Sequence, residues 1–332
     1  MPSIAFLTEH HRFPWERQLA RADPPSNSLP ITYNRIDDDC VLLAVYDDLG
    51  DDIKTGLPRE RRMVMLSEPP GIKVYRRRYL DQFGIVFGPV DPQLDSVRWI
   101  TSQPALPWFY GVGFSSGGRC IANLDLATLA AQPPSAKSAT ISVVISTKRR
   151  LAMHRQRLEL VAALKEHLGS RLHVFGTEFA PIADKADAIA PHAYHLVLEN
   201  NAIDHFWTEK TADAFLGWAL PVISGCKNLG DYFPAGSFVP IDVTDIGGTA
   251  DRIRVLLDSN EWEARLPAIR AARERLIAEY ELSECLRRVA AGLAQGIERV
   301  REPVLLRPNR DLGPAGRLEP LARQFARKLL RR

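Results

Sequence analysis

The sequence predicts an α/β protein made of two domains, each with an open and mainly parallel β-sheet. The chain has 332 residues, which is long for one hydrophobic core and suits two domains of roughly 150 residues each. Short apolar runs alternate with helix-length and turn-rich segments, which is the rhythm of successive βαβ units. Several of these runs are continuously apolar rather than alternating, as is typical of parallel strands covered on both faces.

The first domain is predicted to span residues 1–130. It contains five candidate strands, at residues 4–8, 40–45, 63–66, 85–88 and 97–101. Residues 70–83, between two of these strands, are long enough to form a helix. Residues 128–139 combine Pro133 and Pro134 with small and polar side chains, which indicates a linker and places the domain boundary here.

The second domain, residues 131–300, repeats the rhythm more regularly. Its candidate strands lie at residues 141–146, 171–176, 195–198, 220–224 and 238–242, and its candidate helices at residues 155–168, 209–218 and 250–257. Apolar residues recur at helical spacing in the first of these helices. Residues 261–301 are helical in pattern and charged, and residues 301–332 form a separate C-terminal helical tail.

Composition is that of an ordinary globular protein, with 45% apolar and 25% charged residues. No run of about 18 apolar residues exists and the first residues lack the basic start of a signal peptide, so neither a transmembrane helix nor a leader is expected. The four cysteines are scattered, which favours neither a zinc site nor a disulfide framework. A cytoplasmic location is therefore predicted.

Positive charge is concentrated at the C-terminus. Residues 317–332 carry six Lys/Arg and one Glu, whereas the rest of the chain has a net charge of −2, so no nucleic-acid-binding face is expected on the body. Leucines and Phe325 recur on one helical face of this tail. A basic amphipathic helix predicts peripheral attachment to an anionic membrane surface, on the inner face of the membrane. A helix docked on the body is the alternative.

Residues 194–242 contain the densest group of candidate functional residues. Asn200 follows a buried strand, and Thr208 is placed to cap a helix that begins with Glu209 and Lys210. A helix N-terminus is an anion site. A lysine in the first turn opposes the helix dipole, which makes sense if a diphosphate is bound there. Each residue alone could be a cap, a surface ion pair or a turn asparagine, but the combination favours a nucleotide site.

A series of short motifs runs through this segment without gaps: Leu198-Glu199-Asn200, Trp207-Thr208-Glu209-Lys210, Pro221-Val222, Gly225 and Ser237-Phe238. The series resembles the signature region of the α1,3/4-fucosyltransferases, glycosyltransferase family 10, in its bacterial form. The resemblance implies an inverting glycosyltransferase that moves fucose from GDP-fucose to a saccharide acceptor, including a lipid-linked one. Two Rossmann-like domains facing each other across a cleft then form the GT-B arrangement, and no tightly bound cofactor is implied.

The resemblance also implies which residues contact the donor. Asn200, Glu209 and Lys210 contact GDP, with Lys210 on the phosphates and Glu209 on the ribose, and Thr208 belongs to the same motif. Phe206 stands where the family often has tyrosine, so stacking is expected without the hydroxyl hydrogen bond.

A second patch lies near the start of the second domain. The strand at residues 141–146, the basic residues after it and the helix that follows are similar to the family's strand, basic loop and arginine-bearing helix. Arg157, seven residues before Leu164, matches the family's phosphate-binding arginine. A guanidinium fork suits a diphosphate, and Arg155 is the nearby alternative.

The catalytic base is expected in the first domain, which the resemblance makes the acceptor-binding half. The stretch at residues 65–71 resembles the family's strand ending in an acidic motif, which makes Glu68 the candidate general base. An inverting transfer needs a carboxylate to take the acceptor hydroxyl's proton. Glu9, at the end of the first strand, is the alternative.

No metal site is expected. His10 and His11 have no third ligand spaced with them in the sequence. The acidic residues at 37–39, 47–48 and 51–52 are predicted to lie in solvated loops. The donor diphosphate would then be neutralised by Arg157, Lys210 and helix N-termini.

Two other functions stay open at this point. One is a GT-B transferase that uses a different nucleotide sugar, because the sequence does not define a pocket for the methyl group of fucose. The other is an inactive, membrane-associated protein that binds a nucleotide sugar or a saccharide. The retained Arg157, Glu209 and Lys210 argue against the second.

Overall fold

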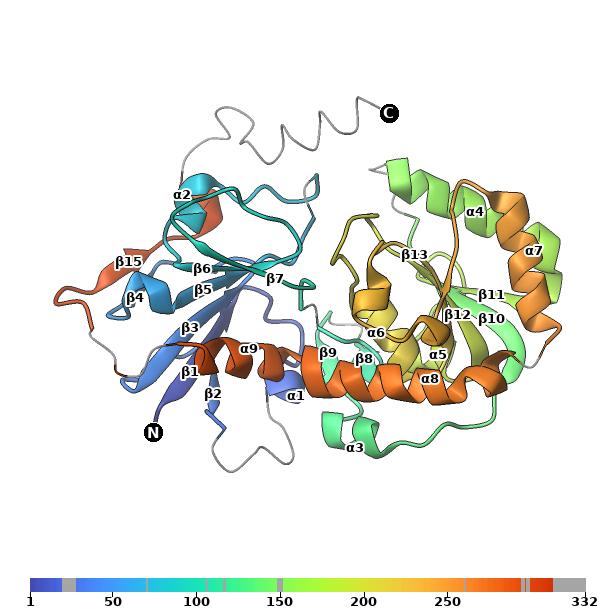
Figure 1. Ribbon diagram of the computed structural model, residues 1–332, viewed down its shortest axis with the longest axis horizontal. Helices are drawn as coiled ribbons and strands as arrows, with labels where there is room; N and C mark the ends of the chain where they lie inside the picture. The colour runs from blue at the N-terminus through green and yellow to red at the C-terminus, as the bar shows by residue number, and fades with distance from the viewer. Residues whose placement is uncertain are drawn as a thin grey trace. The chain divides into compact units, whose positions relative to one another are not determined.

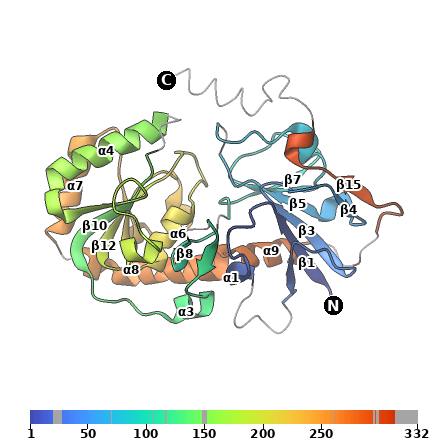
Figure 2. The same cartoon turned by 180° about the vertical axis from the view of Figure 1, so that it is seen from behind.

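The computed structural model describes residues 1–19, 28–69, 71–105, 107–115, 118–147, 152–259, 261–293, 296 and 299–312. The chain divides into two compact units (Figures 1 and 2). Unit 1 comprises Met1–His11, Gln18–Leu106 and Leu282–Arg332, and unit 2 comprises Arg12–Arg17 and Pro107–Glu281. Each unit contains a parallel sheet with helices, so the predicted α/β fold class with two Rossmann-like domains is confirmed.

The sheet of unit 1 has six parallel strands in the order β2-β1-β3-β5-β6-β7. They are β1 (Ser3–Thr8), β2 (Ile31–Tyr33), β3 (Cys40–Tyr46), β5 (Arg62–Met65), β6 (Ile85–Gly88) and β7 (Arg98–Thr101). Every residue of β1, β5 and β6 is buried, because central parallel strands are covered on both faces. The five strands predicted for the first half are confirmed as β1, β3, β5, β6 and β7.

The other described elements of unit 1 are short. They are β4 (Ile53–Thr55), a 3₁₀ helix (Arg59–Arg61), α2 (Arg77–Leu80), α9 (Leu282–Ala291), β15 (Val304–Leu306) and a 3₁₀ helix (Asn309–Asp311). β15 pairs antiparallel with β4. α9 contacts β1 and β3, so a segment distant in sequence completes the cover of this sheet (Figure 1).

The sheet of unit 2 has five parallel strands in the order β11-β10-β12-β13-β14. They are β10 (Ser138–Val144), β11 (Leu172–Phe175), β12 (His192–Leu198), β13 (Leu220–Ser224) and β14 (Val239–Pro240). The principal helices are α4 (Ala152–Leu168), α5 (Lys185–Ile189), α6 (Glu209–Leu216), α7 (Ile246–Leu257) and α8 (Glu261–Arg275). The strands and helices predicted for residues 141–257 are thus confirmed, with shifts of a few residues at their ends.

The other described elements are short. They are α1 (Glu16–Leu19), which crosses the boundary of the units, a hairpin of β8 (Val112–Phe114) and β9 (Cys120–Ala122), α3 (Leu126–Ala131), 3₁₀ helices at Gly169–Arg171, Leu229–Asp231 and Ala235–Ser237, and a π-helix at Leu276–Tyr280.

Helices cover both faces of the unit 2 sheet (Figures 1 and 2). On β12, Leu196 and Leu198 pack into an apolar cluster with α4 and α7, whereas Val197 packs into a second cluster with α6 and α8. Successive side chains of a strand point to opposite faces, so a continuously apolar strand is what this two-sided sheet requires. The sheet is covered by apolar side chains on both faces, and polar residues gather at its carboxyl edge.

Each sheet contains one point where the order of strands reverses. In unit 2 the chain passes from β10 to β11 on one side and then to β12 on the other side of β10. In unit 1 it passes from β1 to β2 on one side and then to β3 on the other side of β1. Ligands of open α/β sheets bind outside the carboxyl ends of the strands at such a reversal. Ligands are therefore expected at the loops after β10 and β12 in unit 2, and at the loops after β1 and β3 in unit 1.

The structural division differs from the boundary predicted at residues 130 and 131. Trp108, Tyr110, Leu126 and Leu129 pack in the same apolar cluster as Phe215 of α6, so the stretch that precedes the predicted linker belongs to unit 2. The chain also returns to unit 1 at Leu282, within the predicted second domain. Aromatic packing, not the Pro-rich stretch, sets the boundary.

The predicted basic amphipathic helix at residues 317–332 lies outside the described residues. Of the segment 301–332, residues 301–312 are described, and they contain β15 and the last 3₁₀ helix. Among the described residues, no helix combines the length and apolar character needed to cross a bilayer.

Candidate functional site

Glu199 joins the end of β12 to the start of α6. Its side chain is 0% exposed, and its carboxylate accepts hydrogen bonds from the Thr208 backbone N–H at 2.8 Å, the Thr208 hydroxyl at 2.6 Å and the Thr211 hydroxyl at 3.0 Å. A buried carboxylate is tolerated only when it is bonded and paired in this way. A Cβ on Gly225 would lie 2.6 Å from the Glu199 Cβ, so this motif glycine leaves room for Glu199.

Thr208 is the N-cap of α6, as predicted from the sequence. Its hydroxyl oxygen accepts a hydrogen bond from the Lys210 backbone N–H at 3.3 Å, which satisfies one of the donors left open at a helix start. The same hydroxyl donates to Glu199, and Thr208 is buried. Thr208 therefore acts through the helix terminus that it orders.

Glu209 lies between two lysines. Its Oε1 is 3.0 Å from the Lys210 Nζ and 3.9 Å from the Nζ of Lys185 on α5. Burial favours the neutral acid, but the charges of Lys210 and Lys185 outweigh it and lower the pKa of Glu209 to about 2. Burial acts against the Lys210 ammonium, yet Glu209 and Glu199, the latter at 3.6 Å, raise its pKa. Both groups are charged at neutral pH.

Arg157 reaches the same edge of the sheet from α4. Its side chain is buried, with the residue 6% exposed, and its guanidinium donates from Nη1 to the Asn200 Oδ1. Its Nε is buried and has no hydrogen-bond partner among the described residues. Burial lowers the pKa of Arg157, but an arginine remains charged at neutral pH. A buried guanidinium that donates to a neutral amide and keeps one unmet N–H fits an anionic ligand.

The structure distinguishes the predicted donor residues. Arg157, Asn200, Glu209 and Lys210 come together around the carboxyl ends of β10 and β12, each contributing charge or an amide. Phe206 is 2% exposed, so its ring has little surface for stacking on a base. Arg155, the alternative to Arg157, lies on the same helix and is exposed.

The sequence analysis did not identify two residues of this site, Glu199 and Lys185. Glu199 belongs to the motif Leu198-Glu199-Asn200, but the sequence analysis assigned it no function. An acidic residue directly after a buried strand could have been identified as a hydrogen-bond acceptor for the start of the next helix. Lys185 lies 24 residues before Glu209, and the Lys185 Nζ is also 2.7 Å from the Asp213 Oδ2. No local signal in the sequence indicates that it reaches this site.

Glu68, the predicted base, lies in unit 1 in the loop after β5 and is half-buried. The backbone N–H groups of Ser67 and Glu68 donate to the Tyr75 hydroxyl oxygen at 3.1 and 3.2 Å. The loop therefore has a defined backbone at the carboxyl edge of the sheet, as the sequence predicted.

The prediction that Asp47 and Asp48 lie in a solvated loop is wrong. Both are buried at the end of β3, because Asp47 accepts from Lys73 and Tyr75 while Asp48 accepts from the backbone N–H groups of Leu49 and Asn309. Turn-rich sequence suggested exposure, but donors from distant segments converge on these carboxylates.

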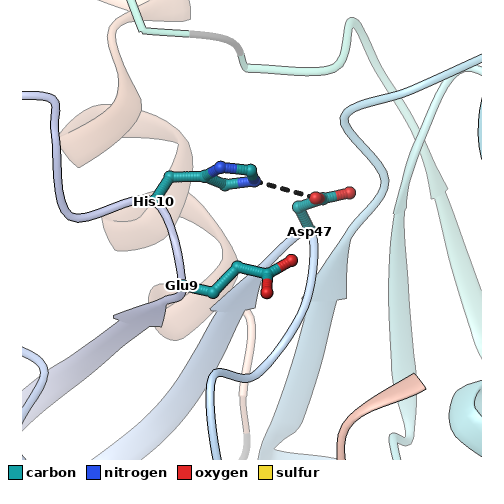
Figure 3. A group of neighbouring side chains, drawn as sticks. All are labelled: Glu9, His10 and Asp47. Carbon is teal, nitrogen blue, oxygen red and sulfur yellow. Dashed lines mark hydrogen bonds and ion pairs between the residues drawn. The ribbon is translucent and has the colours of Figure 1, made fainter. Parts of the chain in front are cut away.

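The reason given against a metal at His10 also needs correction. The fold brings Asp47 to Glu9 and His10, and one ligand atom from each lies within 4.8 Å of the others (Figure 3). However, the Lys73 ammonium is 2.8 Å from the Asp47 Oδ2 and 3.7 Å from the Glu9 Oε1. A protein cation already balances these carboxylates, so the cluster is better described as an ion-pair network.

Comparison with protein-family models gives one match, in the part of the chain that contains this site. Residues 134–262 match the family model described as glycosyltransferase family 10 (fucosyltransferase) C-term. The match contains Arg157, Asn200, Glu209 and Lys210. No curated protein sequence matches the chain.

Several solved structures align along most of the chain. A crystal structure of an α1,3-fucosyltransferase is 14% identical, with 88% of this chain and 91% of that chain covered and a TM-score of 0.48. A GDP complex of an α1,3-fucosyltransferase is 13% identical, with 88% and 92% covered and a TM-score of 0.49. A GDP-fucose complex is 16% identical, with 80% and 81% covered and a TM-score of 0.43. The family model is the more specific of these findings: residues 134–262 of this chain are similar to the C-terminal part of glycosyltransferase family 10.

Proposed function

We propose that the protein transfers fucose from GDP-fucose to a saccharide acceptor with inversion at the anomeric carbon. The observation that carries the donor half of this proposal is Arg157, a buried cation with an unmet Nε–H that lies beside Asn200 at the strand reversal of unit 2. The match of residues 134–262 to the family model supports a glycosyltransferase. The α1,3-fucosyltransferase structures crystallised with GDP and GDP-fucose name the donor we assign here.

The charge of each donor-site residue determines which part of the nucleotide it binds. Arg157 and Lys210 bind the diphosphate, because guanidinium and ammonium groups give short, charge-assisted hydrogen bonds to phosphate oxygens. Glu209, ionised at neutral pH, accepts from the ribose hydroxyls, and Asn200 offers both a donor and an acceptor. As the glycosidic bond breaks, charge develops on the diphosphate, and fixed cations stabilise it without a metal ion.

The acceptor binds to unit 1 in this proposal. Attack on the anomeric carbon from the face opposite the nucleotide requires a base that takes the proton of the acceptor hydroxyl. Glu68 and its alternative Glu9 are the bases that the sequence nominates, and both lie at the carboxyl edge of the unit 1 sheet. The acceptor class extends to lipid-linked saccharides, since the basic residues at 317–332 suit an anionic membrane surface on the cytoplasmic side.

Calorimetric titration with GDP and UDP tests the donor assignment. Wild type should bind GDP more tightly than UDP, and Arg157→Ala should weaken GDP binding about 10- to 100-fold, the effect of losing charge-assisted hydrogen bonds. Arg155→Ala is the matched control, because Arg155 is exposed on the same helix and should leave the affinity unchanged. Preference for UDP would favour the alternative of another nucleotide sugar, and the absence of any nucleotide binding would refute the donor site.

A second measurement addresses the sugar. Release of GDP from GDP-fucose and from GDP-mannose, with water as the acceptor, should be faster for GDP-fucose if the site recognises the 6-methyl group. An equal or higher rate with GDP-mannose would contradict fucose as the donor sugar. Binding of GDP without turnover of either donor would favour an inactive binding protein.

A further inference from the structure

A row of alternating charges runs along the start of α6 in unit 2. The Lys185 Nζ, at the start of α5, lies 2.7 Å from the Asp213 Oδ2 and 3.9 Å from the Glu209 Oε1. The Lys210 Nζ lies 3.0 Å from the same Glu209 oxygen and 3.6 Å from the Glu199 Oε2. Glu209 therefore has two ion-pair partners among the described residues, and they reach it from two different helices.

Both ends of this row are fixed by hydrogen bonds. Glu199 accepts three of them at the start of α6. The Asp213 Oδ1 accepts from the backbone N–H groups of Phe109 at 2.8 Å and Tyr110 at 2.9 Å. The two end carboxylates are 0% and 1% exposed, whereas the side chain of Lys210, near the centre, is 22% exposed. A ligand therefore meets the centre of the row, and the ends support it.

The two lysines of the row have different surroundings. The Lys185 Nζ lies 5.1 Å from the centroid of the Phe109 ring, and this cation–π contact adds to the short ion pair with Asp213. The Lys185 ammonium is therefore anchored by groups that a bound nucleotide does not replace. Lys210 is the more exposed of the two, and it is the lysine that a phosphate oxygen can engage.

Binding of a diphosphate changes the balance of charge at Glu209. The Lys210 ammonium then shares its charge between the Glu209 carboxylate and the phosphate oxygens, and the added anion repels the carboxylate. Both effects favour protonation of Glu209, as does its burial, whereas Lys210 and Lys185 lower its pKa. A protonated carboxyl is a poorer acceptor for a ribose hydroxyl. Of the two lysines, Lys185 keeps its charge close to Glu209 when a diphosphate is bound.

We propose that Lys185 is a positioning residue of the donor site, which holds the Glu209 carboxylate ready to accept from the ribose hydroxyls of a nucleoside diphosphate while Lys210 binds the phosphates. This inference rests on the proposed donor function. An ionised and fixed carboxylate forms strong hydrogen bonds with the hydroxyls of ribose and none with a sugar that lacks them. Lys185, acting through Glu209, is therefore a determinant of the preference for a ribonucleotide.

The experiment compares two nucleotides on the full chain. Calorimetric titration with GDP and with 2′,3′-dideoxy-GDP gives the ratio of their affinities, which reports the contribution of the ribose hydroxyls. The variants are Lys185→Met, Lys185→Arg, Glu209→Gln and the double variant Lys185→Met/Glu209→Gln. Lys165→Met is the matched control, because the Lys165 ammonium donates to the backbone carbonyls of Gly169 and Leu172. Differential scanning calorimetry without ligand checks that each variant is folded.

We expect wild type to bind GDP at least about 10-fold more tightly than dideoxy-GDP, the effect of losing hydrogen bonds to a charged group. Lys185→Met should weaken the binding of GDP about 10-fold and that of dideoxy-GDP less than about threefold. Lys185→Arg should restore most of the ratio, and Lys165→Met should match wild type. The double variant should have the ratio of Glu209→Gln alone, because Lys185 has no carboxylate left to hold.

The pH dependence of the ratio gives a second readout. Removal of the Lys185 charge takes away one of the causes that lower the pKa of Glu209, so the ratio in Lys185→Met should begin to fall at a higher pH than in wild type. If Lys185→Met does not fold because Asp213 is left unpaired, Lys185→Met/Asp213→Asn removes both charges, and it should show the same loss of ratio.

The outcomes separate the two levels of inference. A wild type that binds neither nucleotide refutes the proposed donor function, and the role of Lys185 falls with it. A wild type that binds GDP and dideoxy-GDP equally leaves GDP as the ligand and overturns the role of Lys185. An equal weakening of both nucleotides in Lys185→Met also overturns it, because Lys185 would then act on the phosphates or on the fold and not through Glu209.

Discussion

Replacement of Glu199 by alanine should destabilise unit 2 and weaken donor binding together. The substitution removes a fully buried carboxylate that accepts three hydrogen bonds from Thr208 and Thr211. It also leaves the Lys210 ammonium without the second of its two carboxylates, at 3.6 Å. Because the start of α6 is ordered by these bonds, its backbone N–H groups should lose their fixed direction.

The size of the destabilisation follows from the hydrogen bonds and the ion pair that the substitution removes. Removing one member of a buried, bonded charge network costs about 3–5 kcal/mol, less than the sum of three charge-assisted bonds because Glu199 itself no longer has to be desolvated. For a unit of this size the Tm should fall by about 10 °C. Glu199→Gln keeps the shape and one oxygen acceptor, so it should lie between wild type and alanine.

Differential scanning calorimetry with GDP titrations checks this prediction. Glu159→Ala is the control, since Glu159 is exposed on α4 and its loss should change neither quantity. A Glu199→Ala protein with a Tm within about 2 °C of wild type and an unchanged GDP affinity would show that the start of α6 is ordered without Glu199, and the reasoning above would be wrong.

Three further predictions use other parts of the same networks. Gly225→Ala should cost about 1–3 kcal/mol, because its Cβ would meet Glu199 at 2.6 Å; a thermal melt that matches wild type would contradict this. Glu209 has a pKa of about 2 against 4.5 for a free glutamate, so it stabilises the fold by roughly 3 kcal/mol above about pH 5 and loses this as pH falls towards 2. Urea titrations of wild type and Glu209→Gln should therefore differ at pH 7 and converge in acid, and a difference that is constant with pH would exclude the ion pairs as its cause. Tyr75→Phe should cost about 2–4 kcal/mol, since it removes the hydroxyl that donates to the Asp47 Oδ1 and accepts from the backbone N–H groups of Ser67 and Glu68. Tyr79→Phe, which loses one bond to the Asp47 carbonyl at 3.2 Å, should cost about 1 kcal/mol, and equal costs for the two tyrosines would contradict the assigned network.

The sequence predicted that the candidate donor residues lie close together, because its signal there is local. Asn200, Thr208, Glu209 and Lys210 fall within one strand–loop–helix unit, where period and capping chemistry define position. It did not predict Lys185, which reaches Glu209 from α5, since that contact depends on how two helices pack on the sheet. Phe206, which the sequence analysis assigned to the donor site, is buried, and an aromatic residue in a motif can serve the core as well as a ligand.

The side-chain network at the carboxyl edge of the unit 1 sheet was harder to predict from the sequence, because its contacts join residues that are distant in the chain. Asp47 lies 37 residues from His10 and 26 from Lys73, so sequence spacing contains no sign of the network, and the acidic run around Asp47 resembles a solvated turn. Only strand order brings these residues together. The predicted domain boundary differs from the structural one for a similar reason. The packing of Trp108 and Tyr110 against α6 is a tertiary contact, and no local sequence pattern indicates it.

The two units make chemically different use of the same topological position. At the reversal in unit 2, the Lys210 and Lys185 ammonium groups are paired with Glu199, Glu209 and Asp213, and the Arg157 guanidinium donates to the uncharged amide of Asn200. At the reversal in unit 1, a buried carboxylate supports a half-exposed imidazole. Sugar transfer from a nucleotide needs one group that holds a departing diphosphate and another that receives a proton. A buried guanidinium suits the first, and it would be a poor neighbour for the second, because a nearby cation lowers the proton affinity of any base. The electrostatics therefore predict that the charge of Arg157 will govern GDP affinity.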